Sequence, residues 1–276
     1  MSDGFERVPV VRVRRGAGPA AGADDTVAVE EPLEIRLHGQ SFAVIMRTPG
    51  ADRALTAGFL LAEGVMDDPG DLGAVESCRH PQYPQHHNVV DVFLLGEARA
   101  RLEQHLSQRR QVIASSSCGL CGRATIDALR CRAAPIEVTW SMDAERAAEL
   151  PDRLRAQQSV FDRTGGLHAA ALFTTAGEPL AFAEDVGRHN AVDKVIGSMV
   201  LAERLPLPDA VLVVSGRTSF EIVQKAWIAG VPLICAVSAP SSLAIELASA
   251  AGITLLGFAR DRGFNVYCHP ARLRMV

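Results

Sequence analysis

The sequence lacks any hydrophobic run that approaches the roughly 18 residues needed to cross a bilayer, so we expect no transmembrane helix. Its beginning contains Arg12, Arg14 and Arg15 but no apolar stretch after them, unlike a secretory signal. An excess of basic charge is also missing: 28 Lys and Arg stand against 32 Asp and Glu, which gives a net charge of −4. Proteins that bind chiefly the nucleic-acid backbone are usually basic. We therefore expect a cytoplasmic protein that binds neither membranes nor nucleic acid.

Cysteine is scarce as well, since six in a chain of 276 residues do not make a disulfide scaffold. Thiols of a cytosolic protein stay reduced, and a close pair of them is then catalytic, redox-active or metal-binding. The remaining composition, 48% hydrophobic and 22% charged, is that of a soluble globular protein. The length predicts one large or two modest domains.

The hydrophobic pattern divides the chain into three parts. These are a mobile tail over residues 1–25, a mixed α+β domain over residues 26–141 and an α/β domain over residues 142–276. The middle part begins with a β-hairpin over residues 33–47 and a helix from residue 52. The last part begins with a charged helix from residue 143 to about 161, after which strands and helices alternate. This alternation predicts a largely parallel sheet that helices cover on both faces.

The pattern breaks at residues 118–122, Cys-Gly-Leu-Cys-Gly, which predicts an exposed loop before a short helix. The thiols of Cys118 and Cys121 could reach one metal, one disulfide or one transferred sulfur atom. A structural zinc site needs four ligands, and the other four cysteines include no second close pair. A thioredoxin-like dithiol would follow the first strand of a βαβ unit, which is missing here, and two idle surface thiols would be a liability. A flexible loop with two thiols suits a carrier that passes a persulfide between proteins, and a helix N-terminus would favour the thiolate.

Polar residues gather where the strands of the last part meet loops. They occur at His168 after two glycines, and in residues 184–194, 215–219 and 257–263. Arg217 could pair with phosphate, and Phe258 could stack on a base next to Arg260. Capping groups, a core histidine or an exposed basic turn would explain each segment alone. Because strand ends that lead into helices bind ligands in α/β sheets, together they predict one pocket for a nucleotide-containing ligand.

At these motifs the chain resembles the FdhD family, the formate dehydrogenase accessory sulfurtransferases, over nearly everything after about residue 30. The resemblance implies a sulfur carrier, an enzyme that accepts persulfide sulfur from an IscS-type cysteine desulfurase. It would transfer this sulfur to the molybdenum cofactor, bis-molybdopterin guanine dinucleotide, before the cofactor enters formate dehydrogenase. The resemblance also implies a homodimer and a cytidine-deaminase-like, three-layer α/β/α second domain. Zinc hydrolysis is not expected, because the motifs at His168 and in residues 215–219 lack the further ligands that zinc deaminases need.

The resemblance assigns roles to eight residues. Cys118 would carry the persulfide with Cys121 as its partner, and the cofactor would bind to Phe258, Ala259, Arg260, Asp261, Arg262 and Gly263. The strand-end motifs described above add Arg217 and His168 to the predicted cofactor-binding residues. No structural metal is expected. The roles of Asp185 and His189 stay open. Two other functions also stay open: a chaperone that holds the cofactor without moving sulfur, and a zinc-stabilised interaction module.

Overall fold

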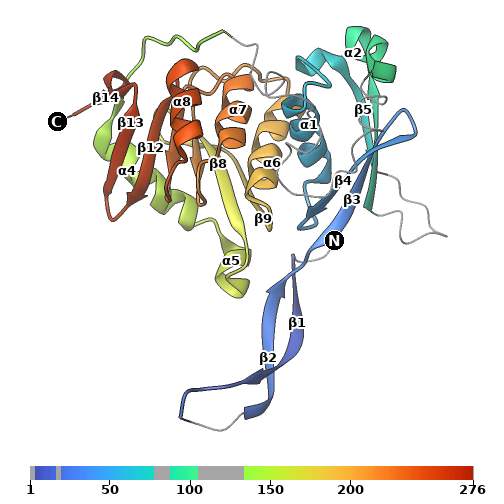
Figure 1. Ribbon diagram of the computed structural model, residues 1–276, viewed down its shortest axis with the longest axis vertical. Helices are drawn as coiled ribbons and strands as arrows, with labels where there is room; N and C mark the ends of the chain where they lie inside the picture. The colour runs from blue at the N-terminus through green and yellow to red at the C-terminus, as the bar shows by residue number, and fades with distance from the viewer. Residues whose placement is uncertain (1–3, 17–19, 78–87, 105–133, 276) are drawn as a thin grey trace.

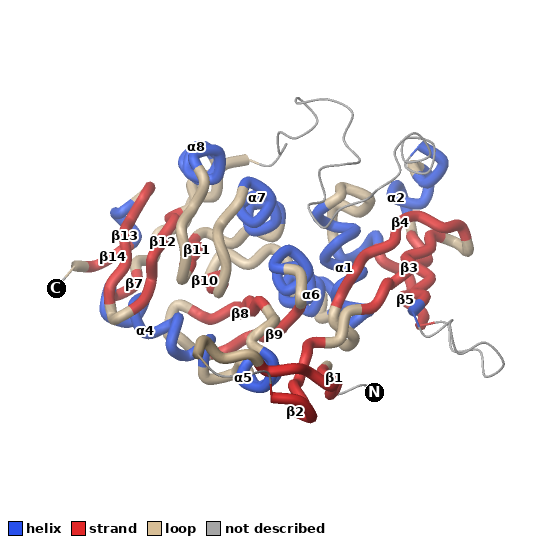
Figure 2. The backbone as a smooth tube through the Cα atoms, turned by 60° about the horizontal axis from the view of Figure 1, so that its bottom comes forward, coloured by secondary structure: helices blue, strands red, loops and turns tan. Residues whose placement is uncertain are grey.

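The computed structural model describes residues 4–16, 20–77, 88–104 and 134–275. Helices lie between a six-stranded sheet and a four-stranded sheet, and a two-stranded hairpin extends away from this body (Figures 1 and 2). The cysteine loop, with Cys118 and Cys121, and the short helix expected after it lie outside the described residues. Among the helices that the structure describes, none is long and apolar enough to cross a membrane.

The six-stranded sheet belongs to the last part of the chain. Its order is β13 (Gly263–Cys268), β12 (Thr254–Arg260), β11 (Leu233–Ala236), β10 (Ala210–Val214), β8 (His168–Thr174) and β9 (Pro179–Asp185). The β10–β11 and β11–β12 pairs are parallel, whereas the β8–β9, β8–β10 and β12–β13 pairs are antiparallel. The expectation of a largely parallel sheet is therefore wrong. The connections β8–β9 and β12–β13 are short turns, and a parallel crossover needs on the order of a dozen residues.

Helices cover both faces of this sheet. α4 (Ala144–Arg155) lies on one face, and α6 (Arg188–Leu201), α7 (Phe220–Ile228) and α8 (Ser242–Ala250) lie on the other (Figure 2). Strand β10 is buried along its whole length because Val211 and Val213 point to the α4 side while Leu212 points to the α7 side. Three α/β/α layers are thus present as expected, and the specific likeness to cytidine deaminases stays a prediction.

The helix expected from residue 143 to about 161 is two helices. α4 ends at Arg155, and α5 (Ser159–Thr164) starts after a turn. The N–H groups of Val160 and Phe161 donate to the Glu184 carboxylate at 3.1 and 2.8 Å. Glu184 lies on β9, so a distant strand satisfies the first N–H groups of α5 and supports a new helix start there.

The middle part of the chain forms the four-stranded sheet. Its order is β4 (Gln40–Arg47), β3 (Glu31–Leu37), β6 (Val89–Leu94) and β5 (Leu72–Ser77), with α1 (Asp52–Ala62), α2 (Gly96–Ala100) and a 3-10 turn, η1 (Pro69–Asp71). α1 packs closely against α6, and neither Gly58 nor Gly197 has room for a Cβ, because each faces backbone of the other helix. One buried apolar cluster contains residues of both sheets. A boundary near residue 141 therefore stays a prediction.

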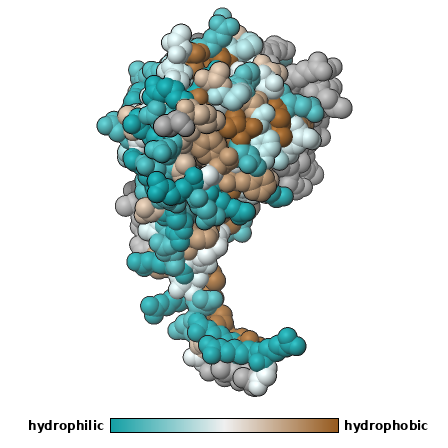
Figure 3. Space-filling view, turned by 90° about the vertical axis from the view of Figure 1, so that its left-hand side faces the viewer, coloured by the Kyte–Doolittle hydropathy of each residue, from teal (hydrophilic) through white to brown (hydrophobic). Residues whose placement is uncertain are grey.

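Two further pairs of strands form small sheets of their own. β7 (Met142–Asp143) pairs with β14 (Leu273–Arg274), next to the 3-10 turn η5 (Pro270–Arg272). β1 (Phe5–Arg12) pairs with β2 (Ala20–Ala28) over residues that the sequence predicts as a tail. Arg163 of α5 lies over the Phe5 ring, with 4.7 Å from Cζ to the ring centroid, at the base of this hairpin. The mobility of the hairpin stays a prediction. It projects away from the body next to α5 (Figure 1). The face of the molecule on the left-hand side of Figure 1 mixes hydrophilic and hydrophobic side chains (Figure 3).

Candidate functional site

Most of the predicted polar segments meet at one edge of the six-stranded sheet. The carboxyl ends of β9, β10, β11 and β12 lie at this edge together with the start of β8, because β8 is antiparallel to β9 and β10. Helices α6 and α7 begin there as well, each directly after a strand. Open α/β sheets commonly bind ligands at such an edge.

A pocket of about 550 Å³ opens at this edge, on the side that α4 covers. Its walls come from the last turns of α4, from α5, from the loop that leads into β8, and from the ends of β10 and β12. Four predicted binding residues line it: His168, Ala259, Arg260 and Asp261. The pocket lining does not include Phe258, Arg262, Gly263 or Arg217.

The turn between β12 and β13 carries the predicted aromatic and basic residues. Asp261 and Arg262 have φ of 51° and 60°, the left-handed values of a two-residue hairpin turn, although such turns favour Asn-Gly. Phe258 also has a positive φ, of 51°, and the residue is 39% exposed. The Arg260 guanidinium lies over that ring, with 5.9 Å from Cζ to the ring centroid. Strained backbone of this kind persists where the surroundings hold it, and it is common at ligand sites.

His168 is half-buried between two arginines. Burial lowers the pKa of His168, and the charges of Arg188 and Arg217 lower it further. Ser215 anchors the start of the strand, because its Oγ accepts a hydrogen bond from the Ala169 N–H at 2.8 Å. A Cβ added at Gly216 would lie 3.3 Å from His168 Nδ1, so glycine allows the close approach. Burial and the two arginine charges therefore favour the neutral form of the imidazole, against the opposing charge of Asp185.

Positive charge at this edge lacks anionic partners in the described part of the chain. The Nε atom of Arg188 is buried without a hydrogen-bond partner among the described residues. The hydroxyl oxygen of Thr218, which follows Arg217 in the loop before α7, is also buried and unpartnered there. Buried polar groups are normally satisfied, and an unpaired guanidinium nitrogen is suited to an anionic ligand.

Asp185, whose role the sequence leaves open, is part of the protein's framework. Its fully buried carboxylate lies 2.7 Å from Lys194 Nζ and accepts hydrogen bonds from Asn190 Nδ2 and the Gly187 N–H, both at 2.8 Å. It also accepts from the Thr48 N–H at 3.2 Å, just after β4. These contacts use the oxygens of Asp185 to fix the start of α6 against the four-stranded sheet.

His189 is likewise buried and paired. Its Nε2 lies 3.1 Å from Ser219 Oγ and 3.7 Å from a carboxylate oxygen of Glu221. The contact joins the first turn of α6 to the start of α7. It fixes the start of α6, which begins at Arg188, beside the end of the loop that carries Arg217.

Sequence reasoning missed one wall of the pocket. Gln158 and Phe161, with Asp152 and Arg155 beside them, line it from α4, α5 and the turn between them. An uninterrupted helix over these residues would not bring them together in this way. No motif or spacing in the sequence marks them, because the turn depends on Glu184 from a distant strand.

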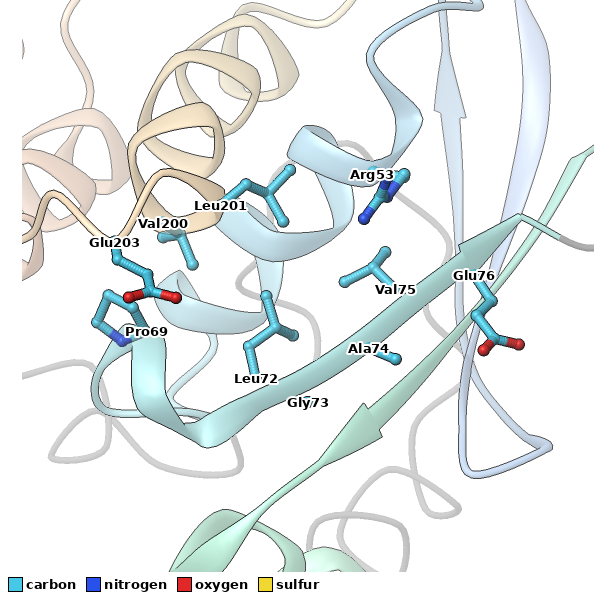
Figure 4. Close-up of a pocket in the computed structure, with 10 residues that line it drawn as sticks. All are labelled: Arg53, Pro69, Leu72, Gly73, Ala74, Val75, Glu76, Val200, Leu201 and Glu203. Carbon is cyan, nitrogen blue, oxygen red and sulfur yellow. The ribbon is translucent and has the colours of Figure 1, made fainter.

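A second cavity, of about 400 Å³, lies between β5 and the end of α6 (Figure 4). Arg53, Glu76 and Glu203 surround an apolar floor that includes Leu72 and Leu201. None of the predicted site residues that the structure describes lines this cavity. The sheet edge is therefore the better candidate site.

Comparison with known proteins identifies the family of this chain. The sequence profile of the FdhD/NarQ family matches residues 28–274. The chain belongs to the FdhD/NarQ family. Among its FdhD/NarQ relatives, the sulfur carrier protein FdhD of Streptomyces coelicolor is 50% identical, over 98% of this chain and 96% of that protein. The sulfur carrier protein FdhD of Sulfurisphaera tokodaii is 43% identical, over 97% and 98% of the two chains.

A solved structure supports the fold of this FdhD/NarQ member. It is the crystal structure of a protein described as a formate dehydrogenase accessory protein, from Desulfotalea psychrophila. The two structures superpose with a TM-score of 0.78 at 24% identity, over 98% of this chain and all of the other. At this identity the likeness bears on the fold alone.

Proposed function

We propose that this member of the FdhD/NarQ family is a sulfur carrier that serves formate dehydrogenase. It accepts sulfur from an IscS-type cysteine desulfurase and transfers it to bis-molybdopterin guanine dinucleotide, which then enters formate dehydrogenase. The observation that carries the proposal is the pair Cys118 and Cys121 in a chain half identical to a protein named sulfur carrier protein FdhD. The proposed functional unit is a homodimer of this chain.

The proposed transfer uses the two thiols in turn. The Cys118 thiolate attacks the outer sulfur of the desulfurase persulfide, so the donor S–S bond breaks, a new S–S bond forms and the desulfurase thiolate leaves. The Cys121 thiolate then attacks the inner sulfur of Cys118 and expels the outer sulfur as sulfide, which becomes a ligand of molybdenum. A Cys118–Cys121 disulfide remains, and a cellular dithiol reductant must reduce it before the next cycle.

The pocket at the sheet edge is the proposed binding site for the acceptor. Phosphate groups carry negative charge, and Arg188, Arg217 and Arg260 supply positive charge at this edge without a carboxylate partner among the described residues. Arginine guanidinium groups pair with phosphate through two parallel hydrogen bonds. A pocket of about 550 Å³ is within the range of ligand sites for molecules of nucleotide size.

Mass spectrometry after incubation with a cysteine desulfurase and free cysteine tests the carrier step. We expect the Cys118 peptide to gain one sulfur atom, to lose it on reduction, and to gain nothing in Cys118→Ala. Cys235→Ala is the matched control, because Cys235 is fully buried and burial raises its pKa to about 12. Unchanged loading of that control separates a missing nucleophile from a damaged fold.

The same experiment discriminates the other functions. Wild-type protein that gains no sulfur but binds the cofactor would contradict the carrier step and favour a chaperone. Bound zinc at the thiols would favour an interaction module. We further expect Arg260→Ala to weaken cofactor binding while sulfur loading of Cys118 stays unchanged.

A further inference from the structure

Gln158 occupies an unusual position in the pocket. It lies in the turn between α4 and α5, where the chain leaves one helix and starts another (Figure 1). The residue is only 4% exposed, yet it lines the pocket at the sheet edge. Glutamine is rarely buried to this degree unless its amide is satisfied.

The backbone of Gln158 is held on both sides. Its N–H donates to the Arg155 carbonyl at 3.2 Å, and its carbonyl accepts from the Asp162 N–H at 3.0 Å. Its side-chain amide, in contrast, has no hydrogen-bond partner in the part of the chain that the structure describes. The backbone therefore holds the side chain in place, and the amide can still donate and accept hydrogen bonds. This is the arrangement of a preorganised ligand contact.

The side chains near Gln158 indicate which class of ligand the pocket would bind. A primary amide offers two N–H donors and one carbonyl acceptor in a plane. Phe161 and Leu154 provide apolar surface beside it, and Asp152 and Asp261 bring carboxylates to the same pocket. A flat heterocycle with a ring carbonyl, a ring N–H and an exocyclic amino group would satisfy the amide and a carboxylate together.

We infer that Gln158 is the residue that binds the heterocyclic edge of the cofactor and contributes to its selection. The amide donates to the ring carbonyl, while a pocket carboxylate, for which Asp152 is the candidate on α4, accepts from the exocyclic amino group. Guanine and the pterin share this edge, with an amino group, a ring N–H and a carbonyl next to one another. Adenine presents a bare ring nitrogen acceptor in place of the ring N–H, and a carboxylate disfavours it. The inference rests on the proposed function, because it assumes that this pocket takes the cofactor.

Calorimetric titration of the full-length protein tests the inference with GDP, IDP and ADP. We expect wild-type protein to bind GDP and IDP more tightly than ADP. Gln158→Leu should weaken the binding of GDP and of IDP by a similar factor, about tenfold or more. Both nucleotides carry the ring carbonyl, which would be buried in the variant without its hydrogen-bond donor. Asp152→Asn should weaken the binding of GDP more than that of IDP, which keeps the ring N–H but lacks the amino group.

Gln157→Leu is the matched control. The neighbouring Gln157 donates from its own amide to the Arg153 carbonyl at 3.3 Å and does not line the pocket. This variant should bind GDP like wild type. A parallel titration with neopterin shows which end of the cofactor the site accepts, since tighter binding than GDP would assign the pocket to the pterin.

The outcomes separate the inference from the proposed function. If wild type binds GDP or neopterin and Gln158→Leu binds it equally well, the role of Gln158 is wrong while the cofactor site stands. If wild type binds neither molecule, the cofactor site fails and the role of Gln158 fails with it. A circular-dichroism spectrum like that of wild type establishes that each variant is folded.

Discussion

Lys194 Nζ lies 2.7 Å from a carboxylate oxygen of Asp185, and both side chains are almost completely buried. Lys194 also donates to the Thr48 carbonyl at 2.9 Å, so the pair joins α6 and β9 to the chain that follows β4. Burying either charge alone would be costly, because the protein interior solvates ions poorly. The two charges therefore stabilise each other and tie the two sheets together.

Removing one member of this pair should destabilise the whole protein. We expect Asp185→Ala to lower the free energy of unfolding by about 3–5 kcal/mol, since it leaves a buried lysine charge without its partner. Urea denaturation followed by circular dichroism measures the change.

The control for this prediction is an exposed ion pair. Arg153 and Glu149 lie 3.1 Å apart on α4, and both side chains are about half exposed. Glu149→Ala should cost no more than about 0.5 kcal/mol. Equal losses for the two variants would show that the buried pair has no special part in stability.

Asp193 should make stability depend on pH. Burial raises its pKa to about 6 from 3.8, although Lys225 at 2.6 Å opposes the shift. Between about pH 4 and pH 6 the folded protein holds this proton while the unfolded chain releases it. The contribution of Asp193 to stability therefore falls as pH rises through that window, by up to about 1.4 kcal/mol per pH unit.

Asp193→Asn removes the titration and isolates this contribution. Urea unfolding of both proteins at several values between pH 4 and pH 6 gives the two slopes of stability against pH. We expect the free energy of unfolding of wild type to fall steadily relative to that of the variant as the pH rises across the window. A constant difference would mean that Asp193 titrates with an ordinary pKa.

The contact between α1 and α6 should not tolerate a methyl group at Gly197. A Cβ there would overlap the carbonyl of Ala54, which is backbone and unable to move without α1. We expect Gly197→Ala to lower the free energy of unfolding by about 3 kcal/mol or more, at or above the upper end for overpacking. Thermal and urea unfolding both report the loss.

Gly166→Ala provides the comparison for this steric argument. The nearest atom to its added Cβ is that of Ala28 at 3.5 Å, an ordinary contact. Its stability should stay close to that of wild type. Near-normal stability of Gly197→Ala would instead show that α1 and α6 can separate at little cost.

The pKa of His168 should depend on the arginine charges at the sheet edge. Burial and the charges of Arg188 and Arg217 lower its pKa below 6.5. Replacement of Arg217 by Gln removes one of these charges, so the pKa of His168 should rise toward its ordinary value. NMR titration of the imidazole follows the change, and Arg262→Gln, at a position not among the causes of the shift, should leave it unmoved. An unchanged pKa in Arg217→Gln would place Arg217 too far away to act.

Local patterns carried much of the fold. The alternating helices of the last part include α8, which spans Ser242–Ala250 with Ser241 as its cap, because apolar spacing and a serine cap are local signals. The continuous apolar run over residues 210–214 likewise forms β10. The motifs at His168 and at residues 258–263 also marked residues that lie at one sheet edge, three of them in the pocket with His168.

Local patterns failed where distant contacts decide the structure. The antiparallel outer strands follow from how β8, β9 and β13 pair, which the alternation of elements does not specify. Residues 5–12 and 20–28 pair as the strands of a hairpin although the sequence predicts a tail over residues 1–25, since few of these residues are apolar enough to mark a core face. The position of Gln158 in the pocket wall could not be predicted either, because it also depends on contacts between residues far apart in the sequence.

The sequence by itself determined the family, the pair Cys118 and Cys121, and the position of most helices and strands, because all of these depend on residues close together in the chain. Only the tertiary structure decided which residues share a site. Glu184 reaches the N–H groups of Val160 and Phe161 across 24 and 23 positions, and this contact sets the start of α5. Hydrogen bonds between residues so far apart leave no periodic trace in a sequence, so Gln158 enters the pocket only once the sheet has formed.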